Sequence, residues 1–292
     1  MDATDTQQRA RRELLSAAAA LGLGGAELGA APQLIATLCD PECSVAEVAK
    51  VAKLQPVVYA KILRVANSAF YGQSRTVASL TRAVTILGLD AVRGIAAAAC
   101  LGQAIRRGAG ASALALRPVL RHCLATAAAA ETLSRQYLPD GASDAFVAGL
   151  LHNLGIALQS RLYPEGIQQL LDRIAGGEPG GIRDLEAACG LIGHETAMAQ
   201  VYEDWALPED IIQSTRHHHR CELAPNRVQK FAALVGLSAH LASRCGYSHP
   251  FEAASLQPRP EDLASLAIES SELDAVLNQL PDRIACLEQA LN

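Results

Sequence analysis

The sequence predicts an all-α fold, and three observations carry that prediction. Half of the 292 residues are hydrophobic but only 4% are aromatic, and much of the apolar content is alanine and leucine. Alanine and leucine favour helices, whereas a β-sandwich needs β-branched and aromatic residues. Apolar residues recur at helical spacing, and no segment alternates convincingly as a strand does. A chain of this length can bury a large core without a disulfide or a metal to hold it.

Helix signals begin in the first half of the chain. Ser44 and Glu47, three residues apart, form a capping box before an apolar helix. Pro56 suits the first turn of the next helix. Residues 89–107 are rich in alanine and predict a long buried helix, and a further helix over 118–137 opens at its proline.

The second half continues the helical pattern. Residues 143–160 predict an apolar helix with a break near Asn153, and the glycine-rich segment 176–181 predicts a loop. Four further helices are predicted, at 182–189, 194–205, 208–218 and 227–245. The tail resumes helical spacing after Pro260, with Pro281 as a break.

The charge of the chain is concentrated at its C-terminal end. The whole chain carries a net charge of −5, but residues 251–292 alone carry about −6 and the remainder about +1. This balance does not favour nucleic-acid binding or adsorption to a membrane. The acidic segment is interpreted either as a solvated helix face or as a docking surface for a basic partner.

Cysteine use and hydropathy predict a cytoplasmic protein. The eight cysteines form no CxxC pair, and several lie in apolar helical stretches, as expected in a reducing compartment. Arg9 and Arg11 precede an apolar stretch in the manner of a signal peptide, but Asp2, Asp5 and Glu13 favour a short leading helix instead. No run of 18 apolar residues is present, so no membrane span is expected.

The histidines are the most informative polar residues, because neutral imidazole is a common ligand of divalent transition metals. Several lie within apolar helices, where they could converge, although a helical histidine is more often a satisfied core residue. The candidate metal ligands are His122, His152, Asn153, His194, His217, His218 and His240. His194 follows Glu186 by eight residues. His217 and His218 would lie about 100° apart on a helix, so at most one should point inward. His219 and His249 are expected at the surface.

One motif in the N-terminal half is specific. Residues 62–66, Ile-Leu-Arg-Val-Ala, precede a turn made of Asn67, Ser68, Ala69, Phe70, Tyr71 and Gly72. The residues that follow fit the pattern V-x-S-L-x-x-A-x-x-x-L-G, over 77–88. We expect Asn67 and Ser68 to end a helix by side-chain bonding and Gly72 to adopt a positive φ.

Together the motif and the histidine order resemble the HDOD domain, a signalling relative of the HD metal-dependent phosphohydrolases. The resemblance implies an HD-like helical domain with an N-terminal helical subdomain. It divides the chain into an extension at 1–29, an HDOD domain at 30–245 with parts 30–110 and 111–245, and acidic helices at 246–292 packed on the domain.

The resemblance also bears on chemistry. A catalytic HD site has the order H…HD…D, in which carboxylates hold metal ions and water is activated. Asn153 stands where the aspartate of the HD pair would be, and His240 stands near the final aspartate. Neutral ligands leave the charge of a metal ion uncompensated, which disfavours Mg²⁺ or Mn²⁺ hydrolysis but still permits Zn²⁺, Ni²⁺ or Fe²⁺.

The first hypothesis is a bacterial signalling output module that acts by protein–protein contacts, with a degenerate metal site and no hydrolase activity. Response regulators, histidine kinases or cyclic-di-GMP pathway proteins are the partners that the resemblance implies. The second hypothesis is a divergent metal-dependent phosphohydrolase for a nucleotide or cyclic dinucleotide. A small-ligand sensor that retains the pocket is the third.

Overall fold

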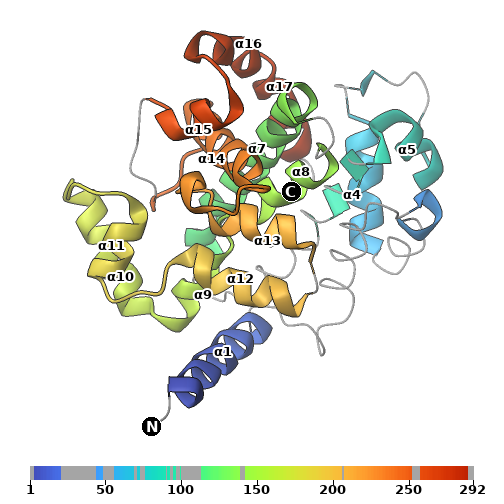
Figure 1. Cartoon of the computed structure of the whole chain (residues 1–292). Coiled ribbons are helices and arrows are strands. Elements are labelled where there is room, and N and C mark those ends of the chain that lie inside the picture. Colours follow the sequence, from blue (N-terminus) through green and yellow to red (C-terminus); the bar gives the residue numbers. More distant parts are fainter. Residues whose placement is uncertain are drawn as a thin grey trace.

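The computed structural model describes residues 3–20, 44–48, 56–68, 71–72, 76–89, 91–92, 95–96, 99, 113–138, 142–205, 207–251 and 257–288. All regular secondary structure in these ranges is helical, which confirms the all-α prediction (Figure 1). None of the described helices is long and apolar enough to cross a membrane.

Three helices form the centre of the fold. Helix α7 (Ala113–Tyr137) packs against α8 (Ala142–Leu151) and α14 (Gln229–Arg244). Four consecutive alanines of α7, residues 127–130, are fully buried. Small side chains allow neighbouring helix backbones to approach closely, so the alanine-rich composition produces a dense centre rather than a loose one.

The predicted start of α7 at Pro118 is wrong. The helix begins at Ala113, and Pro118 lies inside it. An internal proline loses one backbone hydrogen bond and costs roughly 3 kcal/mol in a helix interior. Leu116, Val119 and Leu120 nevertheless continue the buried face of the helix on both sides of the proline. Burial of that face in the core outweighs the local penalty.

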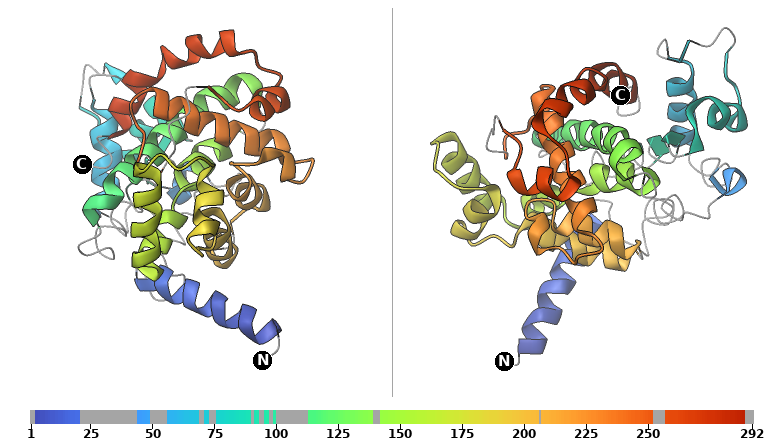
Figure 2. Two further views of the ribbon diagram at one scale, coloured as in Figure 1. Left: turned by 90° about the vertical axis from the view of Figure 1, so that its left-hand side faces the viewer. Right: turned by 45° about the horizontal axis from the view of Figure 1, so that its top comes forward.

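The next helices surround the centre; the helix over 164–175 was not predicted, and the others lie close to their predicted bounds. They are α9 (Gly155–Leu162), α10 (Pro164–Ala175), α11 (Ile182–Ala188), α12 (His194–Asp204) and α13 (Glu209–Arg216). The predicted break in 143–160 separates α8 from α9, and the glycine-rich loop separates α10 from α11. Helix α1 (Ala3–Ala20) packs on α9 and α12, and its N-terminal end projects from the body (Figure 2).

The N-terminal part contains α4 (Pro56–Ala66) and α5 (Leu80–Leu87). The predicted capping box is present, since the Ser44 amide donates to Glu47 Oε2 at 2.8 Å and the Glu47 amide donates to Ser44 Oγ at 3.3 Å. The helix predicted over 89–107 lies mostly outside the described residues. The few of its residues that are described are helical.

The side chain of Asn67 closes the specific turn. Its Nδ2 donates to the carbonyl oxygens of Leu63 (2.8 Å) and Val77 (2.9 Å), and its Oδ1 accepts from the Val77 amide (2.7 Å). The Leu63 carbonyl also accepts from the Asn67 backbone amide at 3.0 Å, so the side chain adds a second bond at the end of α4. Asn67 therefore ends the helix as expected. Gly72 has φ +55°, also as expected.

Ser68 plays a different part from the one predicted. Its Oγ lies 3.3 Å from Cys286 Sγ in the C-terminal helix α17 (Leu280–Glu288), instead of bonding to the end of α4. The partner is 218 residues away in the sequence, so local pattern alone could not identify it. Ala69 and Phe70 lie outside the described residues.

The acidic C-terminal segment forms α15 (Pro260–Leu266), α16 (Leu273–Leu277) and α17. Helix α15 packs on α14, and α17 packs on α7. Pro281 lies in the first turn of α17, and the predicted break falls just before it, at residues 278–279. The segment therefore lies against the central helices, and only its outer face is solvated.

Replacing Asn67 with alanine should destabilise the protein by about 1–2 kcal/mol, because three hydrogen bonds that bridge residues 63 and 77 are lost. Urea unfolding monitored by circular dichroism would measure this. Asn226→Ala, at an exposed turn, is the matched control and should change the free energy of unfolding by less than about 0.5 kcal/mol. Equal effects of the two substitutions would contradict the bridging role.

Candidate metal centre

Six of the eight histidines form one continuous group of side chains, here called the histidine cluster. Its members are His122 on α7, His152 after α8, His194 at the start of α12, His218 and His219 after α13, and His249 after α14. Neighbouring ring centroids lie between 3.9 and 5.6 Å apart. The fold therefore brings together imidazoles from five separate segments.

Backbone carbonyl groups orient three of these rings. The contacts are His122 Nδ1 with Tyr247 O (2.8 Å), His152 Nδ1 with Gly149 O (2.7 Å), and His218 Nδ1 with Thr215 O (2.7 Å). A carbonyl oxygen only accepts, so each Nδ1 must carry the proton and donate it. In a neutral imidazole the Nε2 atom is then an acceptor, and that of His122 lies 3.4 Å from the Thr126 hydroxyl. The same arrangement is typical of histidines that bind metal ions.

Pairs of Nε2 atoms meet inside the cluster. His122 Nε2 and His152 Nε2 are 3.3 Å apart, and His194 Nε2 and His219 Nε2 are also 3.3 Å apart. The two acceptors of the first pair cannot bond to each other without a proton or a cation between them, whereas a neutral His219 with its proton on Nε2 can donate to His194. Two nitrogen ligands on one tetrahedral ion, each about 2.0–2.1 Å from it, would lie roughly 3.3 Å apart. The spacing therefore fits metal ligands.

Protonation of His152 or His218 is unfavourable, so a proton is less suited than a metal ion to the space between the nitrogens. Burial lowers the pKa of His152 well below its ordinary value, and the neighbouring His218 and His122 lower it further. Burial, followed by His194, lowers the pKa of His218 in the same direction. The Nε2 of His218 is buried and has no hydrogen-bond partner among the described residues. His152 and His218 thus present neutral nitrogen donors.

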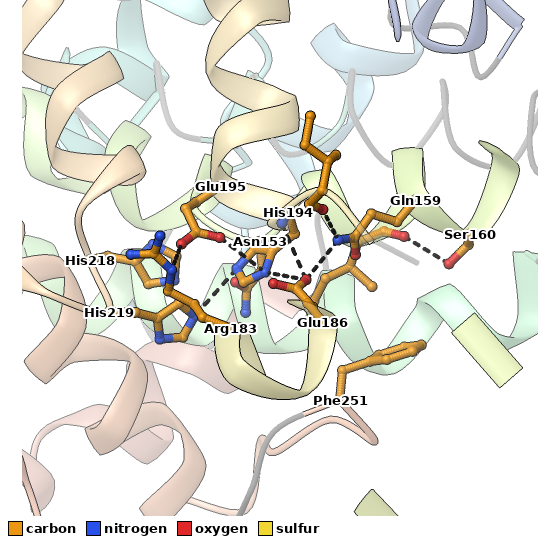
Figure 3. Close-up of polar contacts among 12 residues, drawn as sticks. Asn153, Gln159, Ser160, Arg183, Glu186, His194, Glu195, His218, His219 and Phe251 are labelled. Atoms are coloured by element: carbon orange, nitrogen blue, oxygen red, sulfur yellow. Dashed lines mark hydrogen bonds and ion pairs between the residues drawn. The ribbon is translucent and has the colours of Figure 1, made fainter. Parts of the chain in front are cut away.

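His194 is oriented by a carboxylate instead of a carbonyl (Figure 3). Oε1 of Glu186 accepts from His194 Nδ1 at 2.8 Å, from the His194 amide at 3.2 Å and from Gln159 Nε2 at 2.7 Å. Burial would raise the pKa of Glu186, but the attraction and hydrogen bonds of His194, with the bond from Gln159, lower it below its usual value. Burial would lower the pKa of His194, and Glu186 raises it instead.

A second buried carboxylate lies beside the first. Glu195 forms an ion pair with Arg183 at 2.6 Å, and its Oε2 lies 3.5 Å from His194 Nδ1. Glu186, His194 and Glu195 are close enough to hold a cation. Sequence reasoning assigned no role to either carboxylate. One signal was available: Glu186 follows the buried Ile182 by four residues and so lies on the apolar face of its helix.

Four of the proposed ligands, His122, His152, His194 and His218, are neighbours in the cluster. Asn153 joins them at the edge: its side-chain amide lies 2.9 Å from His249 Nε2, and its buried Oδ1 has no hydrogen-bond partner among the described residues.

His217 and His240 have no ring contact with the cluster among the described residues. His240 instead lines a cavity of about 170 Å³ that adjoins His152, His218 and His219.

The surface placement expected for His219 and His249 is wrong. His249 is only 5% exposed and its ring lies 4.6 Å from that of His122. The rings of His218 and His219 are 3.9 Å apart. Helix α13 ends at Arg216, so these histidines lie in a turn, where the angular spacing of a helix does not apply. Adjacent side chains can therefore face the same interior space.

The fold and the cluster define an all-α protein with a histidine-rich interior. Comparison with known families identifies its class. The HDOD domain family matches residues 29–221. The chain belongs to the HDOD domain family.

Solved structures share this fold at low sequence identity. A proposed phosphohydrolase from Shewanella amazonensis SB2B is 19% identical with a TM-score of 0.69, covering 90% of this chain and 93% of that one. A proposed signal transduction protein from Marinobacter aquaeolei VT8 is 20% identical with a TM-score of 0.71, covering 97% of this chain and 65% of that one. These similarities show the fold alone.

A curated relative is described only as uncharacterized. This Treponema pallidum (strain Nichols) protein is 22% identical over 200 residues, which is 68% of this chain and 38% of that protein. The match thus spans well under half of the relative's length.

Gly155 allows α9 to approach the backbone of His194. A Cβ atom at this position would lie 1.9 Å from the His194 carbonyl oxygen. Gly155→Ala should therefore displace the start of α12 and destabilise the protein by about 2–3 kcal/mol, measured by urea unfolding. Gly181→Ala, whose Cβ would meet only Asp184 Oδ2 at 3.7 Å, is the control and should be nearly neutral. A neutral Gly155→Ala would refute the close approach.

Proposed function

We propose that this protein is a cytoplasmic bacterial signalling output module that acts by contact with partner proteins, and that its metal pocket does not hydrolyse substrate. The observation that carries the proposal is the donor set of the cluster. The Nε2 atom of His152, which faces that of His122, and Oδ1 of Asn153 are neutral. No carboxylate stands at position 153, where a catalytic HD site would use one to bridge metal ions.

The two carboxylates near the cluster do not replace the missing one in this proposal. Glu186 contacts the Nδ1 side of His194, and Glu195 is paired with Arg183. Each therefore has one oxygen committed, to a ring nitrogen or to a cation, while Oε2 of Glu186 has no hydrogen-bond partner among the described residues. A carboxylate behind a ligand histidine makes it a better donor but does not bridge two ions.

The residues present fit a transition metal better than Mg²⁺. His122 and His152 would form one part of the site, and His194, His218 and His219 would form another. Imidazole suits Zn²⁺, Ni²⁺ and Fe²⁺, whereas Mg²⁺ prefers oxygen ligands. A bound ion would supply charge to a cluster of neutral donors, and the chain's own residues would orient and bury it.

The partners remain part of the proposal. Family analogy favours a response regulator, a histidine kinase or a cyclic-di-GMP pathway protein, and the Marinobacter aquaeolei structure is named for signal transduction. The division into an extension at 1–29, a domain at 30–245 and acidic helices at 246–292 belongs to the same proposal.

A divergent metal-dependent phosphohydrolase for a nucleotide or cyclic dinucleotide is the second candidate. One specific observation favours it: the buried carboxylates Glu186 and Glu195 lie within reach of His194. The adjoining cavity of about 170 Å³ offers room beside the cluster. The Shewanella amazonensis structure, named as a proposed phosphohydrolase, has the same fold.

Metal analysis combined with activity assays separates the two candidates. Purified protein should contain Zn²⁺, Ni²⁺ or Fe²⁺, and His152→Ala should lose most of it because one of two facing nitrogens is removed. His217→Ala, which changes a histidine outside the cluster, is the matched control and should retain the metal. Phosphodiesterase assays in Mn²⁺ and Fe²⁺ should show no turnover. Turnover that His152→Ala abolishes would overturn the signalling proposal in favour of the enzyme.

The carboxylate behind His194 provides an independent test of the metal pocket. Glu186→Gln keeps the shape of the side chain but removes the charge that holds the ring. Zn²⁺ affinity should fall roughly 10- to 100-fold, as is typical when such a supporting group is lost. Competition with a chromophoric chelator would measure the change. Unchanged affinity would mean that His194 is not a ligand.

A further inference from the structure

Helix α17 packs on α7, the helix that carries His122 (Figure 1), and its Cys286 contacts Ser68 of the N-terminal motif. Cys286 Sγ lies 3.3 Å from Ser68 Oγ, and both residues are buried. The guanidinium of Arg283 on the same helix interacts with the Tyr71 phenol. The specific turn 67–72 is therefore covered, in part, by the C-terminal end of the chain.

A buried ion pair fixes the position of α17 on α7. The carboxylate of Glu131 on α7 is 2% exposed and binds both Arg283 and, at 2.8 Å, Arg135. A buried carboxylate without a cation is strongly unfavourable. The pair with Arg283 therefore ties α17 to α7 at this point.

The other end of α17 reaches the groups that orient His122. Glu288 accepts from Arg121 Nε at 2.5 Å and from the Tyr247 hydroxyl at 3.3 Å. Arg121 is the residue before His122 on α7. Tyr247 supplies the carbonyl oxygen that lies 2.8 Å from His122 Nδ1. The Glu288 carboxylate thus binds Tyr247, which contacts this ring, and Arg121, which precedes His122 in the sequence.

We propose that α17 is a clamp that couples the histidine cluster to the turn 67–72. A metal ion bound by His122 and His152 strengthens the seating of α17 on Ser68 and Tyr71, and loss of the ion loosens it. The inference rests on the proposed function, because it requires that the histidine cluster binds a metal ion.

The coupling has a defined physical route. An ion that holds the Nε2 of His122 fixes the ring, and the ring's Nδ1–H then holds the Tyr247 carbonyl. Tyr247 and Arg121 in turn hold Glu288. A ligand shifts a conformational equilibrium only if it interacts differently with the two states. Here the two states are α17 seated and α17 loosened, and the metal ion favours the seated state because these contacts are formed only there. Linkage is reciprocal, so a weakened clamp must weaken metal binding by the same factor.

Hydrogen exchange on the unmodified protein tests the first direction. The backbone amides of residues 280–288 should exchange about fivefold or more slowly with Zn²⁺ than with EDTA, the lower end of typical coupling. Unchanged exchange of this segment, in protein that binds Zn²⁺, would overturn the clamp. No substitution is needed, so a folding defect cannot obscure the result.

A pair of variants on α17 tests the reverse direction. Glu288→Gln removes the charge that binds Arg121 and should weaken Zn²⁺ affinity about fivefold. Asp282→Asn makes the same charge change at an exposed position of the same helix and should leave the affinity unchanged. Equal affinities of the two variants and the parent would overturn the clamp and leave the metal pocket standing. A parent protein that binds no Zn²⁺ would remove the metal part of the proposed function and the clamp with it.

Discussion

A neutral imidazole has a single proton, and in four histidines of the cluster that proton is committed to an oxygen behind the ring. The Nδ1–H groups of His122, His152 and His218 donate hydrogen bonds to backbone carbonyl groups, and that of His194 donates to Glu186. The Nε2 atoms of His122 and His152 then face each other in the buried interior. The buried Nε2 of His218 has no hydrogen-bond partner among the described residues, which is costly, so this arrangement favours a cation. The positions of the surrounding turns, and the chemistry of the site, depend on this constraint.

The same constraint limits what the site can do. Nitrogen donors on neutral rings can hold a transition metal, but they do not compensate the charge of two ions that share a bridging water. The carboxylates of the region lie outside the facing nitrogens: Glu186 supports His194, and Glu195 is paired with Arg183. Binding and orientation are therefore better supported than hydrolysis. The accessible cavity beside His240 shows that the cluster is not sealed by the core on that side.

The turn at 67–72 and the C-terminal helix α17 meet beside this interior. Asn67 closes the turn of the N-terminal part by three hydrogen bonds, and Ser68 of the same turn meets Cys286. Helix α17 continues along α7 to Glu288, which touches the residue before His122. The acidic segment, which carries the net charge of the chain, is thus a structural element through its inner face. The carboxylates on the outer face of the segment can remain solvated while its inner face packs on the central helices.

The sequence by itself determined the helical class, most helix bounds after residue 142, the turn at Asn67 and the set of histidines. These features depend on periodicity, capping and local side-chain bonds, which act over a few residues. Only the tertiary structure decided that Pro118 lies inside a helix, that His219 and His249 are interior, and that Ser68 meets Cys286. The reason is physical: burial of a helix face can outweigh a local penalty, and contacts between distant segments leave no periodic trace in the sequence.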